Sequence, residues 1–169
     1  FFLASAAPES LFAEEGPEDF QAEYKWDGIR CQLIKRMGQV ILWSRGEDLL
    51  TERFPEIRDA AATMPDGTVV DGEILAWEGD RPAPFQVLQP RISRKSVSAK
   101  MLREAPAAFM AYDLMELGGK DIRGMELRER RALLEGLAAE WKRPSDGMST
   151  VAVLQLSPLV AGLTWEEQI

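Results

Sequence analysis

The chain has 169 residues, 46% of them hydrophobic and 28% charged, which is typical of one soluble globular domain. A single cysteine, Cys31, excludes an internal disulfide, and the absence of histidine excludes His-based catalytic triads and argues against a zinc site. The net charge of −8 argues against a dedicated nucleic-acid-binding domain, although the distribution of charge matters more than its sum. The single cysteine fits a reducing interior, so a cytoplasmic protein is expected. No apolar run approaches the roughly 20 residues of a membrane helix, so no membrane contact is expected.

The first part of the chain predicts a surface loop followed by short strands. The segments are, in order, a loop over 8–19, a strand over 23–25, a turn at Asp27 and Gly28, a strand over 29–36, a turn at Met37 and Gly38, and a strand over 40–43. Apolar and polar residues alternate over 29–36, which predicts one buried face containing Cys31 as a small apolar residue. The turn at 37–38 predicts that the two flanking strands form an antiparallel hairpin.

The remaining chain mixes helical and strand patterns. The segments are, in order, a helix over 54–64, a turn at 65–67, a strand over 68–77, a short helix over 84–91, a strand over 107–115, a turn at 118–121, a helix over 126–141, a strand over 151–156, and a helix start at Thr164. The strands pair as hairpins rather than as single βαβ units. The predicted fold is therefore α+β, with largely antiparallel sheets flanked by helices.

A basic stretch lies between Arg81 and Arg103, where six basic residues occur without an acidic one. Two interpretations stay open for it. It is either a solvated loop and helix face, or a patch that contacts phosphates. On the second interpretation, Arg91, Arg94 and Lys95 are the candidate DNA-contacting residues.

Lys25 is the candidate nucleophile of the chain. It lies beside a predicted strand and two residues before Asp27-Gly28, where a tight turn exposes it. A lysine amine attacks phosphorus only in its neutral form, which nearby cations or removal of water favour. Arg30 and Arg45 could supply that positive charge. A lone Lys-x-Asp-Gly match is also typical of an ordinary surface lysine, so further motifs must decide.

Further motifs follow in order, and together they resemble the covalent nucleotidyltransferases: DNA ligases, RNA ligases and mRNA capping enzymes. The segment 23–30 resembles motif I, Ser44-Arg45-Gly46 motif Ia, Asp71-Gly72-Glu73 motif III, and 109–114 motif IIIa, and the segment from Asp121 to Arg131 also resembles ligase sequence. Trp26 and the Phe85, Leu88-Gln89 and Arg91 pattern resemble bacterial and archaeal ATP-dependent DNA ligases more than capping enzymes. The resemblance covers nearly the whole chain and implies the adenylation domain of such a ligase, with a nucleotidyltransferase (ATP-grasp-like) fold.

The resemblance also implies roles for individual residues. Lys25 would attack the α-phosphate of ATP and carry AMP, and Mg²⁺ would offset the charge of the phosphates. AMP would then pass to the 5′-phosphate of a nick in duplex DNA, and the 3′-hydroxyl would complete the seal. The nucleotide-binding residues would be Glu23 at the adenine amino group, Tyr24 and Trp26 beside the lysine, Arg30 and Arg45 at ribose and phosphate oxygens, Glu73 at the ribose hydroxyl or a metal ion, and Tyr112 stacked on the adenine.

Each of these roles has a structural alternative. Glu23 and Glu73 could be strand carboxylates that face water, and Arg30 and Arg45 could form surface salt bridges. Tyr112 could be an ordinary core aromatic, and Trp26, Trp43 and Trp77 are expected as core or pocket wall.

The sequence also departs from the family pattern. A Glu-Gly motif IV and a motif V with two lysines are not found, and Glu135-Gly136 lies inside a predicted helix. We therefore expect residues 1–169 to form an incomplete, C-terminally truncated adenylation domain of a longer polypeptide. An N-terminal DNA-binding domain and a C-terminal OB-fold domain are expected outside this chain. Self-adenylylation without motifs IV and V is in doubt, and a monomer in a prokaryotic, nucleoid-associated setting is expected.

Three alternatives to a nick-sealing DNA ligase remain. The first is an RNA ligase or capping-type enzyme, which covalent labelling with ATP and GTP would separate. The second is a catalytically inactive nucleotide- or DNA-binding module, against which the combination of Lys25, Arg45 and Glu73 argues. The third is an end-joining protein that carries further enzyme domains.

Overall fold

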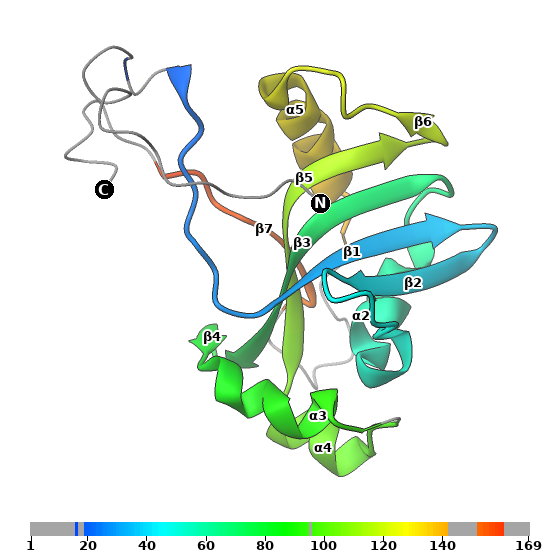
Figure 1. Ribbon diagram of the computed structural model, residues 1–169, viewed down its shortest axis with the longest axis vertical. Helices are drawn as coiled ribbons and strands as arrows, with labels where there is room; N and C mark the ends of the chain where they lie inside the picture. Colours follow the sequence, from blue (N-terminus) through cyan, green and yellow to red (C-terminus); the bar gives the residue numbers. More distant parts are fainter. Residues whose placement is uncertain (1–15, 17–18, 95, 142–151, 161–169) are drawn as a thin grey trace. The chain divides into compact units, whose positions relative to one another are not determined.

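The computed structural model describes residues 16, 19–94, 96–141 and 152–160 (Figure 1). The chain divides into two units, and each is described by itself. The first unit consists of Phe1–Lys25 and Ser157–Ile169, and the second of Trp26–Leu156. Among the described residues, no helix has both the length and the apolar character needed to cross a membrane.

Seven strands of the described residues form one sheet in the second unit (Figure 1). The main path runs through β2 (Gln39–Ser44), β1 (Ile29–Arg36), β3 (Thr68–Glu78), β5 (Ala107–Leu117) and β6 (Lys120–Asp121). The short β4 (Arg81–Ala83) pairs antiparallel with β3, and β7 (Leu154–Leu156) pairs parallel with β5. The predicted hairpin of 29–36 with 40–43 is confirmed, and so is the largely antiparallel pairing.

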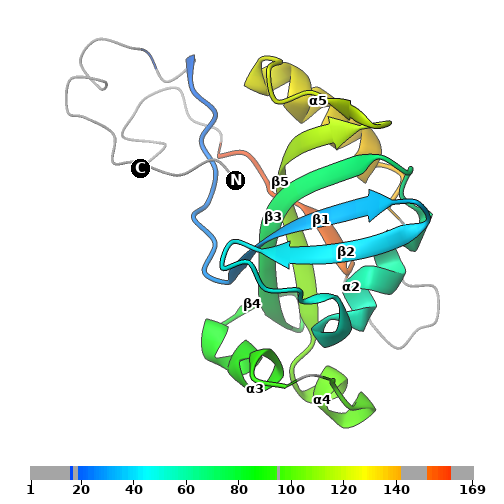
Figure 2. The same cartoon turned by 45° about the vertical axis from the view of Figure 1, so that its right-hand side comes forward.

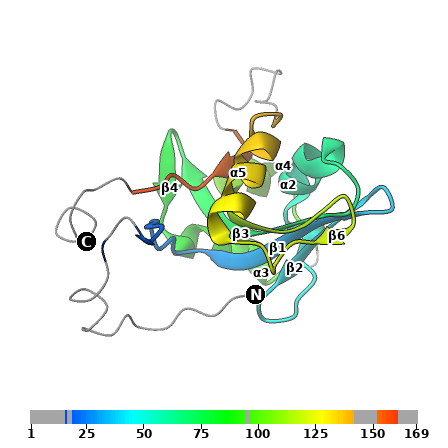
Figure 3. The same ribbon diagram turned by 90° about the horizontal axis from the view of Figure 1, so that it is seen from above.

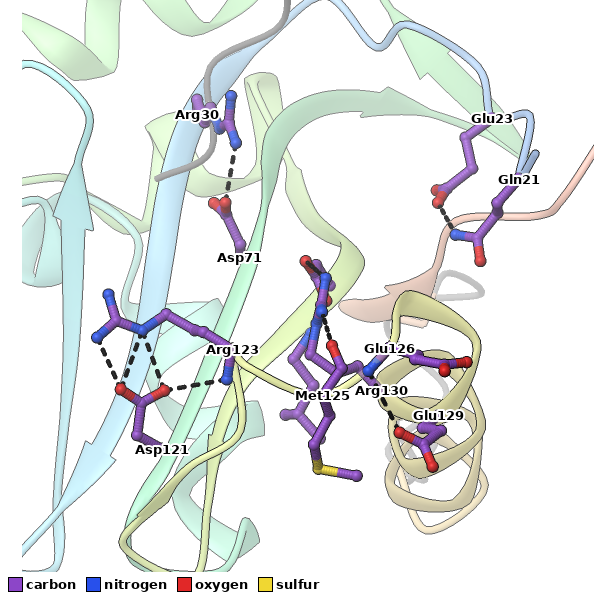
Figure 4. A network of polar contacts seen from close by, with 12 residues as sticks. Gln21, Glu23, Arg30, Asp71, Asp121, Arg123, Met125, Glu126, Glu129 and Arg130 are labelled. Atoms are coloured by element: carbon purple, nitrogen blue, oxygen red, sulfur yellow. Dashed lines mark hydrogen bonds and ion pairs between the residues drawn. The ribbon is translucent and has the colours of Figure 1, made fainter. Parts of the chain in front are cut away.

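The helical elements are short except for the last. They are the 3₁₀ turns η2 (Thr51–Arg53), η3 (Ala61–Thr63) and η4 (Phe85–Leu88), and the helices α2 (Pro55–Ala60), α3 (Gln89–Ile92), α4 (Ala99–Glu104) and α5 (Leu127–Ala138). Pro55 occupies the first turn of α2, where a missing N–H costs nothing. A capping box of Glu126 and Glu129 fixes the start of α5 (Figure 4).

The main core lies on one face of the sheet, where α2 and α5 pack (Figure 3). Alternation along the strands sends Cys31 and Leu33 of β1 into this core, together with Ile57 of α2 and Leu134 of α5. Cys31 is fully buried, as its sequence context predicts. The opposite face receives the intervening residues of β1 and β3, and it is this face that carries polar chemistry.

Several sequence predictions need correction. In the region predicted as a strand over 23–25, Glu23 forms an isolated bridge with Leu159 and no regular strand. The helix predicted over 54–64 is divided into α2 and η3, and the strand predicted over 151–156 covers only Leu154–Leu156, residue 151 lying outside the described part. The strand β4 and the helix α4 were not predicted (Figure 2). The parallel pairing of β5 with β7 was not predicted either. Nearly all of the predicted loop at 8–19, and the helix start at Thr164, lie outside the described residues.

Candidate functional site

An ion pair between β1 and β3 lies at the centre of the polar sheet face. Nη2 of Arg30 lies 2.9 Å from Oδ2 of Asp71 (Figure 4). Asp71 is only 1% exposed, and burial raises the pKa of its carboxyl group, although Arg30 opposes the shift. Its second oxygen, Oδ1, is buried and has no hydrogen-bond partner among the described residues. Arg30 is thereby held in place over the sheet rather than forming a surface salt bridge.

Glu73 lies on the same face, two residues after Asp71 on β3. Strand alternation places both carboxylates on this face and Gly72 on the core face, against Phe109. The Glu73 carboxylate accepts a hydrogen bond from the backbone of Gly28, where a Cβ would collide with the β3 backbone. Burial raises the pKa of Glu73 to about 7, although Arg30, the Gly28 hydrogen bond and Arg45 act in the opposite direction. Glu73 is therefore not a solvated strand carboxylate.

Tyr112 of β5 joins the same group of residues. Its hydroxyl lies 3.4 Å from the carbonyl oxygen of Gly72, to which it donates a hydrogen bond. The guanidinium carbon of Arg30 lies 5.7 Å from the centre of the Tyr112 ring, in the range of a cation–π contact. The ring is half-buried and faces the cation rather than the main core. Arg30 thus connects Asp71, Tyr112 and, through charge, Glu73.

Arg45 follows β2 and lies at the edge of this group. Its backbone N–H donates to the carbonyl oxygen of Arg30 at 3.0 Å, and its side chain is exposed. The turn that presents it is fixed by Ser44, whose hydroxyl accepts from the backbone N–H of Asp48 at 3.0 Å. A solvent-facing guanidinium beside the Glu73 carboxylate is well placed to contact an anionic ligand.

A small apolar cluster continues this face beyond the charged residues. It is formed by buried Leu75, Trp77, Ala108 and Met110, with half-buried Trp26 packed against it. Trp26 belongs to the second unit, where it packs against this apolar cluster.

Three of the predicted site residues, Glu23, Tyr24 and Lys25, lie in the first unit. Glu23 forms its bridge with Leu159, and its Oε1 accepts a hydrogen bond from Nε2 of Gln21 at 2.6 Å (Figure 4). Tyr24 is 58% exposed, and Lys25 is also exposed. Lys25 ends the first of the two segments that make up this unit, and it is followed directly in the chain by Trp26 of the second unit.

The prediction that Arg91 contacts DNA is wrong, because its side chain is 0% exposed. Its guanidinium binds both carboxylate oxygens of Glu56, at 2.6 and 2.9 Å, and the carbonyl oxygens of Arg53 and Ala105. It also lies over the ring of Phe54. Arg94 is exposed, whereas Lys95 lies outside the described residues.

Sequence reasoning missed two acidic residues that shape the site. Asp71 was treated only as part of a motif, yet it anchors Arg30. Asp113 likewise belongs only to a motif, the segment 109–114, yet it forms a buried pair with Arg130 of α5 directly after Tyr112. The alternation of 68–77 is the signal that could have placed Asp71 on the face of Glu73.

No group of three or more His, Cys, Asp or Glu side chains in the described part of the chain could hold a metal ion. One or two carboxylates, such as those of Glu73 and Asp71, are enough for Mg²⁺ when the phosphates of a bound nucleotide supply further oxygen ligands. Glu73 suits this role better than Asp71, because Asp71 already pairs with Arg30.

The chain is similar to known proteins over most of its length. A family model described as "ATP dependent DNA ligase domain" matches residues 2–155. A probable DNA ligase of Opitutus terrae is 41% identical and aligns with 91% of this chain and 16% of that protein. DNA ligase C2 of Mycolicibacterium smegmatis is 42% identical and aligns with 73% of this chain and 35% of that protein.

Solved structures give the same result for the fold. The ligase domain of Mycobacterium tuberculosis LigD has a TM-score of 0.63 and 27% identity, and the match covers 87% of this chain and 42% of that one. A mycobacterial DNA ligase D complexed with ATP and MES has a TM-score of 0.62 and 26% identity, with the same coverage. The predicted nucleotidyltransferase fold is thereby confirmed. The chain spans between about a sixth and a third of the length of the two curated relatives described above.

Proposed function

The chain belongs to the ATP-dependent DNA ligase family and corresponds to its adenylation domain, and from this premise we propose that Lys25 accepts AMP from ATP. The whole protein then seals nicked duplex DNA. The observation that carries the proposal is the group formed by Arg30, Asp71, Glu73 and Tyr112 on one sheet face. Such a group offers cationic, anionic and aromatic contacts, which suit the phosphates, ribose and base of a nucleotide.

The proposed chemical step is a displacement at phosphorus. Nζ of Lys25 forms a bond with the α-phosphorus of ATP while the bond to pyrophosphate breaks, and the amine loses a proton. Arg30 and Arg45 bind ribose and phosphate oxygens, and Tyr112 stacks on the adenine. Tyr24 and Trp26 flank the lysine in sequence and complete the proposed nucleotide-binding set.

Glu23 is proposed to select adenine by accepting a hydrogen bond from its amino group. The hydrogen bond from Gln21 holds one of its carboxylate oxygens. Glu73 is proposed to bind the ribose hydroxyl or Mg²⁺. Bound Mg²⁺ would neutralise part of the negative charge of the ATP phosphates.

The later steps need DNA. AMP passes from Lys25 to the 5′-phosphate of a nick, and attack by the 3′-hydroxyl releases AMP and closes the strand. We propose that most of the DNA affinity lies in an N-terminal DNA-binding domain and a C-terminal OB-fold domain of the whole protein. The exposed side chains of Arg94, Lys100 and Arg103 contribute locally through phosphate contacts.

Covalent labelling tests the proposal. The full-length protein is incubated with Mg²⁺ and either α-labelled ATP or α-labelled GTP, denatured, and examined for bound label, with nick sealing measured in parallel. We expect label from ATP and sealing of nicked duplex DNA. Label from GTP alone indicates a capping-type enzyme, and sealing of RNA nicks only indicates an RNA ligase. An absence of label from either nucleotide indicates a binding module.

A further inference from the structure

Tyr112 lies at an irregularity of the sheet. In the antiparallel pairing of β3 with β5, Gly72 lies opposite Ala111 and Asp71 lies opposite Asp113. Tyr112 is therefore the additional residue of a β-bulge. A bulge bends its strand and changes the direction in which a side chain points, and bulges are common beside functional sites.

The residue directly after the bulge is tied to α5. Nε and Nη2 of Arg130 each lie 2.9 Å from a carboxylate oxygen of Asp113, which makes the pair bidentate. Nη1 of Arg130 also donates to the carbonyl oxygen of Met125 at 2.6 Å (Figure 4). Only 9% of the Arg130 side chain and 11% of the Asp113 side chain are exposed.

Asp113 is also fixed to its own strand. The backbone N–H of Leu114 donates to Oδ1 of Asp113 at 2.8 Å. The Asp113 carboxylate thus receives donors from β5 and α5 together, which restricts its backbone as well as its side chain. Tyr112, one peptide bond away, instead contacts Gly72 and Arg30 on the polar face of the sheet.

We propose that Arg130 and Asp113 are positioning residues that hold the β5 bulge so that the Tyr112 ring faces the nucleotide. This inference rests on the proposed role of Tyr112 in stacking on adenine. Neither residue touches the nucleotide; both act through the backbone of β5. Their loss weakens nucleotide binding more than it slows the transfer of AMP, because Arg30 keeps its ion pair with Asp71 and Glu73 keeps its hydrogen bond from Gly28.

A matched control exists in the same chain. Arg91 and Glu56 form a second bidentate pair with a fully buried guanidinium, between α3 and α2. Substitution of Glu56 by Gln removes the same kind of charge from the same kind of pair. A merely structural role for Asp113 predicts that Asp113→Asn and Glu56→Gln behave alike.

The experiment measures Lys25 adenylylation in the full-length protein over a range of ATP concentrations. The variants are Asp113→Asn, Arg130→Lys, Glu56→Gln and Tyr112→Leu, each assayed well below its measured unfolding temperature. For the first two, we expect the half-saturating ATP concentration to rise about 5- to 30-fold, with a smaller change in the rate at saturation. Glu56→Gln should leave the half-saturating concentration at the wild-type value.

A double-mutant cycle provides a second readout that does not depend on stability. Asp113→Asn should add little further loss of ATP affinity when Tyr112 is already Leu, because both changes remove the same contact. Fully additive effects, or equal effects of Asp113→Asn and Glu56→Gln, overturn the inference. If Tyr112→Leu itself leaves ATP affinity unchanged, the proposed stacking role fails first and the inference fails with it.

Discussion

Glu73 has an unusual ionisation for a strand carboxylate. Burial raises its pKa to about 7, while Arg30, the Gly28 backbone and Arg45 favour the charged form. A bound cation or a ribose hydroxyl would favour the ionised carboxylate further. The Glu73 carboxyl group therefore changes its charge near neutral pH.

The substitution Glu73→Gln tests this ionisation. Because the pKa of Glu73 is raised in the folded protein, the fold binds this proton more tightly than the unfolded chain does. The contribution of Glu73 to stability therefore falls as pH rises from about 4.5 through about 7. Thermal unfolding from about pH 5 to pH 8 should show the wild type losing stability relative to Glu73→Gln.

If the thermal stabilities of the wild type and Glu73→Gln change in parallel with pH, the raised pKa of Glu73 is contradicted. Activity supplies a second readout, since the variant lacks the charge that the proposed function needs. Its adenylylation rate should be low at every pH, whereas the wild-type rate rises as Glu73 ionises.

At the residue scale, the sequence predicts which strand residues are buried better than it predicts the ion-pair partners of charged residues. The buried position of Cys31 follows from strand alternation, and its thiol pKa is raised by burial. Arg91 was misjudged because a run of basic residues does not reveal which guanidinium a distant Glu56 will bind. Asp71 was missed for the same reason, because its partner Arg30 lies 41 positions away in the chain.

At the scale of elements, β3 and β5 approach closely at Gly72. A Cβ at this position would overlap the ring of Phe109 and lie 2.6 Å from the carbonyl oxygen of Met110. The motif therefore needs glycine between its two carboxylates to let the strands pair. Gly136 in α5 is the opposite case, because a Cβ there meets no atom within 4 Å outside its own helix.

These two glycines give opposite predictions for substitution by alanine. Gly72→Ala should lower the free energy of unfolding by about 1–3 kcal/mol or more, because the packed backbone must shift. Gly136→Ala should raise it by about 0.5–1 kcal/mol, because alanine loses less entropy in a helix. Chemical denaturation of both variants checks the pair, and a stable Gly72→Ala protein would show that β3 and β5 are not so closely packed.

Local signals decide which elements the sequence can predict. The hairpin of β1 and β2 and the helix α5 carry strong alternation, turn residues and caps, and both are found. The parallel β5–β7 pair and the bulge at Tyr112 depend on contacts between distant segments, and no local pattern predicts them. The strand β4 covers only Arg81–Ala83 and contains Pro82, which hides it from a strand pattern.

At the scale of the whole molecule, the predicted α+β class follows from strands that pair as hairpins between helical segments, and the family follows from the order of motifs. The sequence could not predict that residues 1–25 and 157–169 group as one unit, because Glu23 and Leu159 are far apart in the chain. The net charge of −8 is unfavourable for binding to the phosphate backbone of DNA. It agrees with the proposal that other domains of the whole protein supply most of the DNA affinity.

The most direct test of the account is to identify the residue that carries AMP. The full-length protein is incubated with ATP and Mg²⁺, digested, and mapped by mass spectrometry, with Lys25→Ala as the control. We predict that one peptide gains an adenylyl group, that this group is on Lys25, and that the control gains none. An adenylyl group on any other side chain, or undiminished adenylylation of Lys25→Ala, would contradict the central claim.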